Sequence, residues 1–114
     1  MTNLVASQEQ IEICRRYDSA VVPCAADVIV AVALATLGRQ PVCGMREPLP
    51  PGGNVSWFFY CGDASDAAGF YQPVHLSHLR ECLPQVIPYL CLAPGYAFVI
   101  DDTGYEDVWL RGGS

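Results

Sequence analysis

The residues best suited to chemistry are two histidines and a cysteine, His75, His78 and Cys82. Spacings of three and four residues place these side chains on one face of a helix. There they could supply three of the four ligands of a zinc ion, with the fourth from elsewhere in the chain. Amphipathic helices often carry such a pair, and buried polar groups usually find ordinary partners. We therefore expect one buried and one surface histidine, with no bound metal or other cofactor.

A cysteine and a histidine could also form a nucleophilic dyad. A small metal- or thiol-dependent enzyme that uses His75, His78 and Cys82 is therefore the alternative function. The motifs of common enzyme classes are missing, since the sequence contains no G-x-S-x-G and no G-x-G-x-x-G. The chain also has no lysine, which excludes a phosphate-binding lysine. The sequence predicts that the protein is not an enzyme.

An acidic cluster near the C-terminus points to a binding role. Its carboxylates are interleaved with aromatic rings, which supply buried area at interfaces while the charges steer a basic partner. The cluster lacks the D-x-[DN]-x-[DN]-G pattern of a calcium loop. Trp109, just beyond it, is expected in the core, because tryptophan is usually packed. The predicted partner-binding residues are Asp101, Asp102, Tyr105, Glu106 and Asp107.

The overall charge agrees with a basic protein partner. Twelve acidic residues face six arginines, for a net charge of −6. Such a surface repels nucleic acid and anionic lipid, so neither is expected as a partner. Acidity of this size can also simply keep a small protein soluble.

The compartment follows from what the sequence lacks. The first ten residues carry no basic residue and no apolar run, and the apolar stretch 28–37 is too short for the roughly 20 residues of a membrane helix. We expect a cytoplasmic protein. Its six cysteines include no C-x-x-C pair, so in a reducing compartment they are expected to be free thiols.

The elements that must position these residues are short. Ser7 and Gln10 resemble a capping box for a helix over 8–17, and Pro73 is suited to open the helix that carries the histidines. A short helical segment is expected at 85–90. The Pro- and Gly-rich stretch 41–54 predicts a loop, and 101–104 a hairpin turn. Runs of β-branched and aromatic residues predict strands at 28–32, 56–61, 96–100 and 108–110.

These elements alternate irregularly and show no linker. They predict one α+β domain over 1–111, with a mainly antiparallel sheet and a few short helices. Residues 112–114, Gly-Gly-Ser, are expected to form a flexible tail, and such a sequence is also typical of a cloning remnant.

Four segments carry a family resemblance: WFFYCGD (57–63), FYQPVHLSHL (70–79), PYLCLAPGYAFVI (88–100) and GYEDVW (104–109). In this order and spacing they resemble the immunity protein 33 domain family of bacterial polymorphic toxin systems, as does the stretch 38–47. Ala93 and Ala97 stand where the family pattern prefers a proline and an arginine. The resemblance implies an antitoxin that binds a cognate toxin and blocks its active site or substrate access. It implies no catalytic residue and no cofactor.

Overall fold

The computed structural model describes residues 6–24, 28–48, 55–65 and 67–111. The expected C-terminal tail and the centre of the expected Pro-rich loop lie outside these ranges.

The first element is helix α1 (Gln8–Arg16), which begins at the capping box predicted from the sequence. Gln10 N donates to Ser7 Oγ at 3.1 Å, and Ser7 N donates to Gln10 Oε1 at 2.9 Å. These two bonds satisfy backbone donors that the first helical turn otherwise leaves unpaired. Ile13 and Cys14 form the buried side of the helix and join the core.

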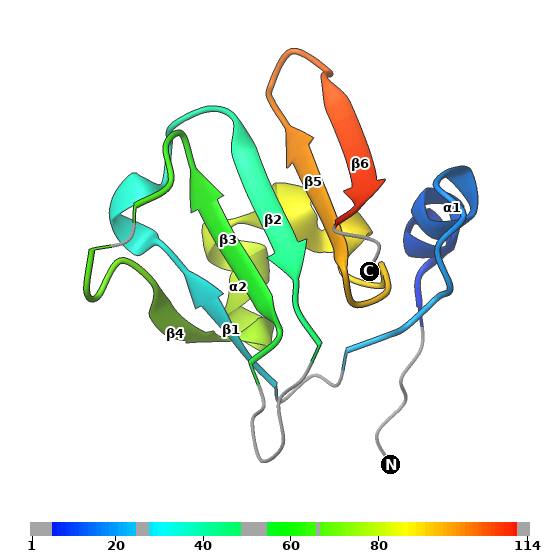
Figure 1. Cartoon of the computed structure of the whole chain (residues 1–114), viewed down its shortest axis with the longest axis horizontal. Coiled ribbons are helices and arrows are strands. Elements are labelled where there is room, and N and C mark those ends of the chain that lie inside the picture. Colours follow the sequence, from blue (N-terminus) through cyan, green and yellow to red (C-terminus); the bar gives the residue numbers. More distant parts are fainter. Residues whose placement is uncertain (1–5, 25–27, 49–54, 66, 112–114) are drawn as a thin grey trace.

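Six strands form a single sheet, in the order β4-β1-β3-β2-β5-β6 (Figure 1). The β1–β3 pair is parallel, and the other four neighbouring pairs are antiparallel. The prediction of an α+β domain with a mainly antiparallel sheet is therefore confirmed. The strands are β1 (Ile29–Val32), β2 (Val42–Arg46), β3 (Trp57–Cys61), β4 (Gln72–His75), β5 (Tyr96–Ile100) and β6 (Glu106–Leu110).

Helix α2 (Leu76–Cys82) and the 3-10 helix η2 (Pro84–Tyr89) pack on one face of this sheet, behind the strands in Figure 1, and α1 lies beside the sheet and contacts η2. A short 3-10 turn, η1 (Leu34–Thr36), follows β1. Aromatic rings fill the layer between sheet and helices: Phe98 stacks on Tyr89 with ring centroids 4.6 Å apart, and Trp57 stacks on Phe59 at 5.2 Å. Both Phe59 and Phe98 are fully buried.

The second face of the sheet is covered by none of the described helices (Figure 1). Side chains alternate between faces along a strand. Because Trp57, Phe59 and Cys61 of β3 face the helices, Phe58 and Tyr60 lie on the opposite side, where both are half-buried. We call this second side the open face.

The predicted loop over 41–54 is wrong in its first part. Val42 to Arg46 form β2, which pairs with β3 on one side and β5 on the other. Gly44, which reads as a loop residue, is needed in this strand because a Cβ there would lie 2.4 Å from Phe98 Cε2. The core aromatic ring occupies the space that a side chain would take.

The predicted helix start at Pro73 is also wrong. Pro73 lies in β4, an edge strand, where the missing N–H costs no ladder hydrogen bond. The helix begins at Leu76, and His75 is its N-cap. His75 therefore does not share a helical face with His78 and Cys82.

Candidate functional site

The turn between β5 and β6 is held by one carboxylate oxygen. Asp101 Oδ1 accepts hydrogen bonds from Thr103 N at 2.9 Å, Thr103 Oγ1 at 2.7 Å and Tyr105 N at 3.1 Å. The bonds from Thr103, followed by the bond from Tyr105, lower the pKa of Asp101 below its ordinary value. Within the described chain, Oδ2 of the same carboxylate has no hydrogen-bond partner, so it is available to an outside donor.

The neighbouring predicted residues are at the surface. Asp102 and Asp107 are exposed, and Tyr105 is 53% exposed. The ion pairs among the described residues include none of Asp101, Asp102 and Asp107. Three carboxylates near this turn therefore have no ion-pair partner among the described residues and can meet a cation of an outside partner.

A shallow hollow lies beside this turn. It measures about 370 Å³ and is lined by Gln40, Pro41, Val99, Asp101 and Tyr105. Its wall combines apolar groups, an aromatic ring and a carboxylate. This combination suits the end of an arginine or lysine side chain, whose stem packs on apolar groups while its charge meets a carboxylate or a ring.

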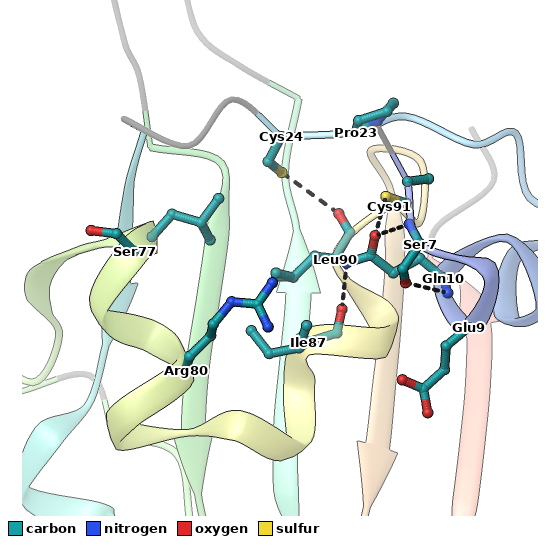
Figure 2. Close-up of a pocket in the computed structure, with 12 residues that line it drawn as sticks. Ser7, Glu9, Gln10, Pro23, Cys24, Ser77, Arg80, Ile87, Leu90 and Cys91 are labelled. Carbon is teal, nitrogen blue, oxygen red and sulfur yellow. Dashed lines mark hydrogen bonds between the residues drawn. The ribbon is translucent and has the colours of Figure 1, made fainter. Parts of the chain in front are cut away.

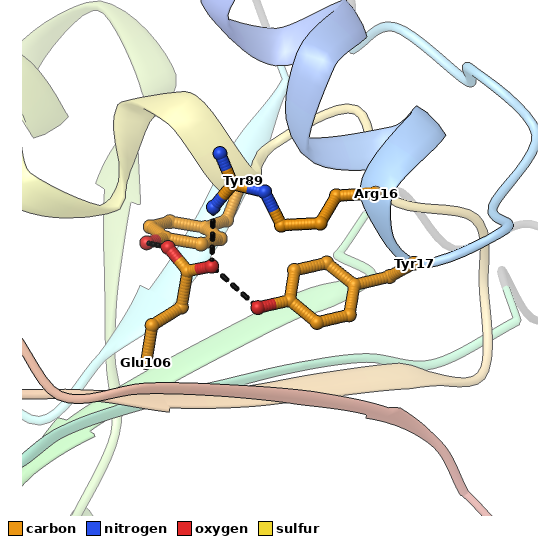
Figure 3. Close-up of polar contacts among 4 residues, drawn as sticks. All are labelled: Arg16, Tyr17, Tyr89 and Glu106. Atoms are coloured by element: carbon orange, nitrogen blue, oxygen red, sulfur yellow. Dashed lines mark hydrogen bonds and ion pairs between the residues drawn. The ribbon is translucent and has the colours of Figure 1, made fainter.

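Glu106 is placed differently from the rest of the predicted cluster. Its side chain points to the helix side, where the carboxylate accepts hydrogen bonds from Arg16 Nη1 at 2.7 Å, Tyr89 Oη at 2.6 Å and Tyr17 Oη (Figure 3). These three donors come from the end of α1 and from η2. We call the four residues the Glu106 junction, because they tie α1 and η2 to the edge strand β6.

The junction perturbs the acid–base chemistry of its members. Partial burial raises the pKa of Glu106, but the bonds from Tyr17, Tyr89 and Arg16 together outweigh it and leave the pKa below its ordinary value of 4.5. Burial and the bond to Glu106 raise the pKa of both Tyr17 and Tyr89. At neutral pH the junction therefore holds one carboxylate and two neutral phenols.

Trp109 was expected in the core, and this prediction is wrong. Its side chain is 41% exposed and lies on the open face, because Trp109 pairs with Ala97 while its neighbour Val108 faces the helices. β6 is an edge strand, and no described element packs over it on that side. The tryptophan therefore belongs to the surface next to Asp107.

The candidate metal site does not assemble in the described residues. His75 and His78 lie close, with ring centroids 5.8 Å apart, but both are exposed, so the expectation of one buried histidine is wrong. Cys82 is half-buried on α2. Across the described ranges, no three or more His, Cys, Asp or Glu side chains gather in a geometry that could hold a metal ion.

The six cysteines are free thiols, as predicted. Burial is the main cause that raises the pKa of each thiol above its ordinary value of 9.0. Thiols of this kind are protonated at neutral pH and are poor nucleophiles. They are Cys14, Cys24, Cys43, Cys61, Cys82 and Cys91.

A cavity that the sequence did not indicate lies on the helix side (Figure 2). It measures about 690 Å³ and lies among α1, α2 and η2. The polar groups on its wall largely bind one another: Gln10 Nε2 donates to Ile87 O at 2.8 Å, and the thiol of Cys91 lies 3.4 Å from Gln10 Oε1. Arg80 and Glu9 also line it, so the wall carries one charge of each sign.

Arg46 is a buried charge at the end of β2, within the stretch predicted to be a loop. Its Nη1 donates to the carbonyl oxygens of Val22 at 2.7 Å, Leu90 at 3.3 Å and Leu92 at 2.7 Å. The guanidinium also lies 5.8 Å from the centre of the Trp57 ring. These contacts hold the segments around Val22 and around Leu90 and Leu92 against the centre of the sheet, so Arg46 has a structural role.

The described part of the chain contains no helix long and apolar enough to cross a membrane. No curated protein and no solved structure matches the chain. A sequence model of the Imm33-like domain matches residues 9–111, nearly the whole chain and all ten helices and strands except the first residue of α1. The chain therefore belongs to the Imm33-like domain family.

Proposed function

We propose that this chain is an immunity protein that binds a cognate bacterial toxin and neutralises it by covering its active site. The family description supports an immunity role. The observation that carries the proposal is the β5–β6 turn, where Asp101, Asp102 and Asp107 carry charges unpaired by any described residue beside the exposed ring of Tyr105.

This arrangement suits a binding protein. Exposed carboxylates of one sign accelerate the encounter with a basic surface and orient the two proteins before they touch. The turn is prepared for contact, since Asp101 already fixes its backbone through three hydrogen bonds. Little conformational entropy is then lost at this site on binding.

Glu106 takes a different part in the proposal. Its carboxylate is occupied by Arg16, Tyr17 and Tyr89, so it supports the β5–β6 hairpin from behind. We assign partner contact to Asp101, Asp102, Tyr105 and Asp107, and a positioning role to Glu106.

We further propose that the chain acts in the cytoplasm and is not an enzyme. Six free cysteines are typical of a reducing compartment. Burial raises the pKa of each of the six thiols, which makes them poor nucleophiles, and no group of described His, Cys, Asp and Glu side chains could hold a metal ion.

Charge reversal tests the proposal through association kinetics. The probe is the catalytically inactive C-terminal domain of the toxin encoded beside this chain's gene. Asp102→Lys with Asp107→Lys should slow association by about tenfold or more at low salt. The difference should shrink at high salt, because salt screens exposed charges.

The matched control is Glu9→Lys with Glu81→Lys, which makes the same change in net charge on exposed residues of α1 and α2. It should change the association rate much less. If both double variants slow association equally, the turn has no special role. If the unaltered chain does not bind the toxin domain, the proposed function is wrong.

A further inference from the structure

We propose that the toxin docks on the open face of the sheet, with Trp109 as an apolar anchor and the acidic turn as the charged rim. This inference rests on the proposed function, and it names the surface through which that function would be exerted.

Strand register gives the first observation. One row of paired residues crosses all six strands on the open face, and every member is apolar. The small members, Ala31 and Ala97, are buried among larger neighbours, and Trp109 ends the row at the sheet edge. In order from β4 to β6, the row is Pro73, Ala31, Phe58, Met45, Ala97 and Trp109.

A second row runs beside the first and leads to the acidic turn. It crosses β3, β2, β5 and β6 as Tyr60, Cys43, Val99 and Asp107. Val99 also lines the hollow beside Asp101 and Tyr105. The apolar row, the hollow and Asp107 therefore lie next to one another on the same side of the sheet.

This pattern is unusual for a solvent-facing sheet. A sheet covered by helices on one side normally alternates apolar residues inward with polar residues outward. Here the outward residues are mostly apolar, and such patches rimmed by polar groups mark interaction sites. From the usual strand spacing and rise per residue, the open face measures on the order of 24 by 16 Å. This area is smaller than one side of a standard protein interface, so residues around the face would have to complete the contact.

Aromatic packing makes part of this surface rigid. Phe58 lies edge-on to Tyr71 with ring centroids 5.4 Å apart, and Tyr71 lies edge-on to Phe70 with ring centroids 4.9 Å apart. Phe70 is tilted against Tyr60, with ring centroids 6.3 Å apart. Burial, followed by the neighbouring Cys43, raises the pKa of Tyr60 to about 12, so its phenol is neutral in the cell. Rings held this way lose little freedom when a partner covers them.

The charges on the open face indicate which kind of partner would bind there. The two rows contain a carboxylate, Asp107, and no basic residue. A second copy docked through the same face would present the same residues, since a two-fold interface is self-complementary. It would offer Asp107 no cation from these rows, and each copy carries a net charge of −6. A toxin domain with an apolar centre bordered by arginine or lysine would fit: its apolar centre would pack on the two rows, and its basic residues would meet the carboxylates of the acidic turn.

The two tryptophans allow a test that needs no substitution. Trp57 is buried at 1% exposure on the helix side, and Trp109 is 41% exposed on the open face. In a chain labelled with fluorotryptophan, the catalytically inactive toxin domain of the adjacent gene should shift the ¹⁹F signal of Trp109. The signal of Trp57 should stay in place.

Neighbouring residues of β6 give a matched pair of variants. Trp109 and Leu110 are both exposed, at 41% and 55%, and point to opposite faces. Trp109→Arg should weaken binding of the toxin domain at least about 30-fold, the effect of losing a hot spot of about 2 kcal/mol. Leu110→Arg should change affinity less than about threefold, as expected outside the contact.

The outcomes separate this inference from the function on which it rests. If the toxin domain still binds Trp109→Arg and does not shift the ¹⁹F signal of Trp109, docking on the open face is refuted and the immunity role is unaffected. Equal weakening by Leu110→Arg also refutes it. A chain dimer that Trp109→Arg dissociates assigns the face to a second copy instead. Failure of the unaltered chain to bind refutes both proposals. Trp109→Ala gives the same comparison if the arginine variant melts early.

Discussion

Glu106 and Asp107 are neighbours in the sequence but serve opposite faces of β6. Glu106 lies on the helix side within the Glu106 junction, whereas Asp107 is exposed on the open face. Because side chains alternate along a strand, a run of acidic residues on a strand divides between two environments. The sequence shows the run, and only the position of the helices shows which carboxylate is internal.

This division predicts different effects on stability. Glu106→Gln removes the charge that three donors share, so the free energy of unfolding should fall by about 1–3 kcal/mol. Asp107→Asn should change it by less than about 0.5 kcal/mol, as at most surface sites. Urea unfolding at pH 7 measures both. Equal effects would mean that the Glu106 junction does not hold α1 and η2 to β6.

The same junction predicts a dependence on pH. The pKa of Glu106 is lowered in the folded protein, so its stabilising contribution is complete above its ordinary value of 4.5 and is lost as pH falls through the folded-state pKa. The stability difference between the unaltered chain and Glu106→Gln should therefore be largest above about pH 5 and shrink toward pH 3. A difference that stays constant over this range would contradict the contacts drawn in Figure 3.

Elements were predictable where local signals agreed with the tertiary fold. The capping box of α1, the aromatic run of β3 and the Asp–Gly turn between β5 and β6 each depend on neighbouring residues, and each is confirmed. Strands β2 and β4 were not predicted, because the contacts that make these segments strands are with residues distant in the sequence. Gly44 alone indicates a loop, and only its close contact with Phe98 explains a glycine in a strand. Pro73 alone indicates a helix start, and only the edge position of β4 explains a proline in a strand.

The central position of β2 gives a prediction at this scale. In Gly44→Ala, the new Cβ would lie 2.4 and 2.5 Å from two atoms of Phe98 and 3.0 Å from Phe59, and both rings are fully buried. Overpacking of this kind should lower the free energy of unfolding by about 1–3 kcal/mol.

Gly69→Ala is an informative comparison, since nothing lies within 4 Å of its added Cβ, although Gly69 has a φ of +77°. Its cost should come from backbone strain alone, about 1 kcal/mol. Thermal unfolding compares the two. A Gly44→Ala variant as stable as the unaltered chain would show that Phe98 can move, and that β2 does not pack as described.

The candidate site was partly visible in the sequence. Composition and spacing indicate the acidic turn, where Asp101 and Tyr105 line one hollow and Asp102 and Asp107 are exposed; their contact with a partner stays a prediction. The open face was not visible, because WFFYC shows no polar alternation and reads equally as a strand buried on both sides. Trp109 was expected in the core because tryptophan is usually packed, and it is exposed because β6 lies at the edge of the sheet. The sequence carries the apolar pattern, but not the fact that the described helices leave one face uncovered.

For the whole molecule, the main hydrophobic core and the proposed contact surface lie on opposite sides of the sheet. Helices α2 and η2, the buried aromatic rings, Arg46 and the Glu106 junction all lie on one side of the sheet or within its core. The open face contributes the small buried residues Ala31, Cys43 and Ala97, whereas Asp102 and Tyr105 of the acidic turn are exposed. Under the proposed function, substitutions on the contact surface could change which toxin is bound while the scaffold is kept.

Protection of living cells tests the immunity role most directly. The toxin domain encoded beside this gene is induced in a host that lacks both genes, with and without this chain, and colony formation is counted. An unrelated toxin serves as the control. We expect the toxin domain to kill the host, and we expect this chain to restore growth against it but not against the unrelated toxin. If the cells die although this chain is present at its full level, the immunity role is wrong.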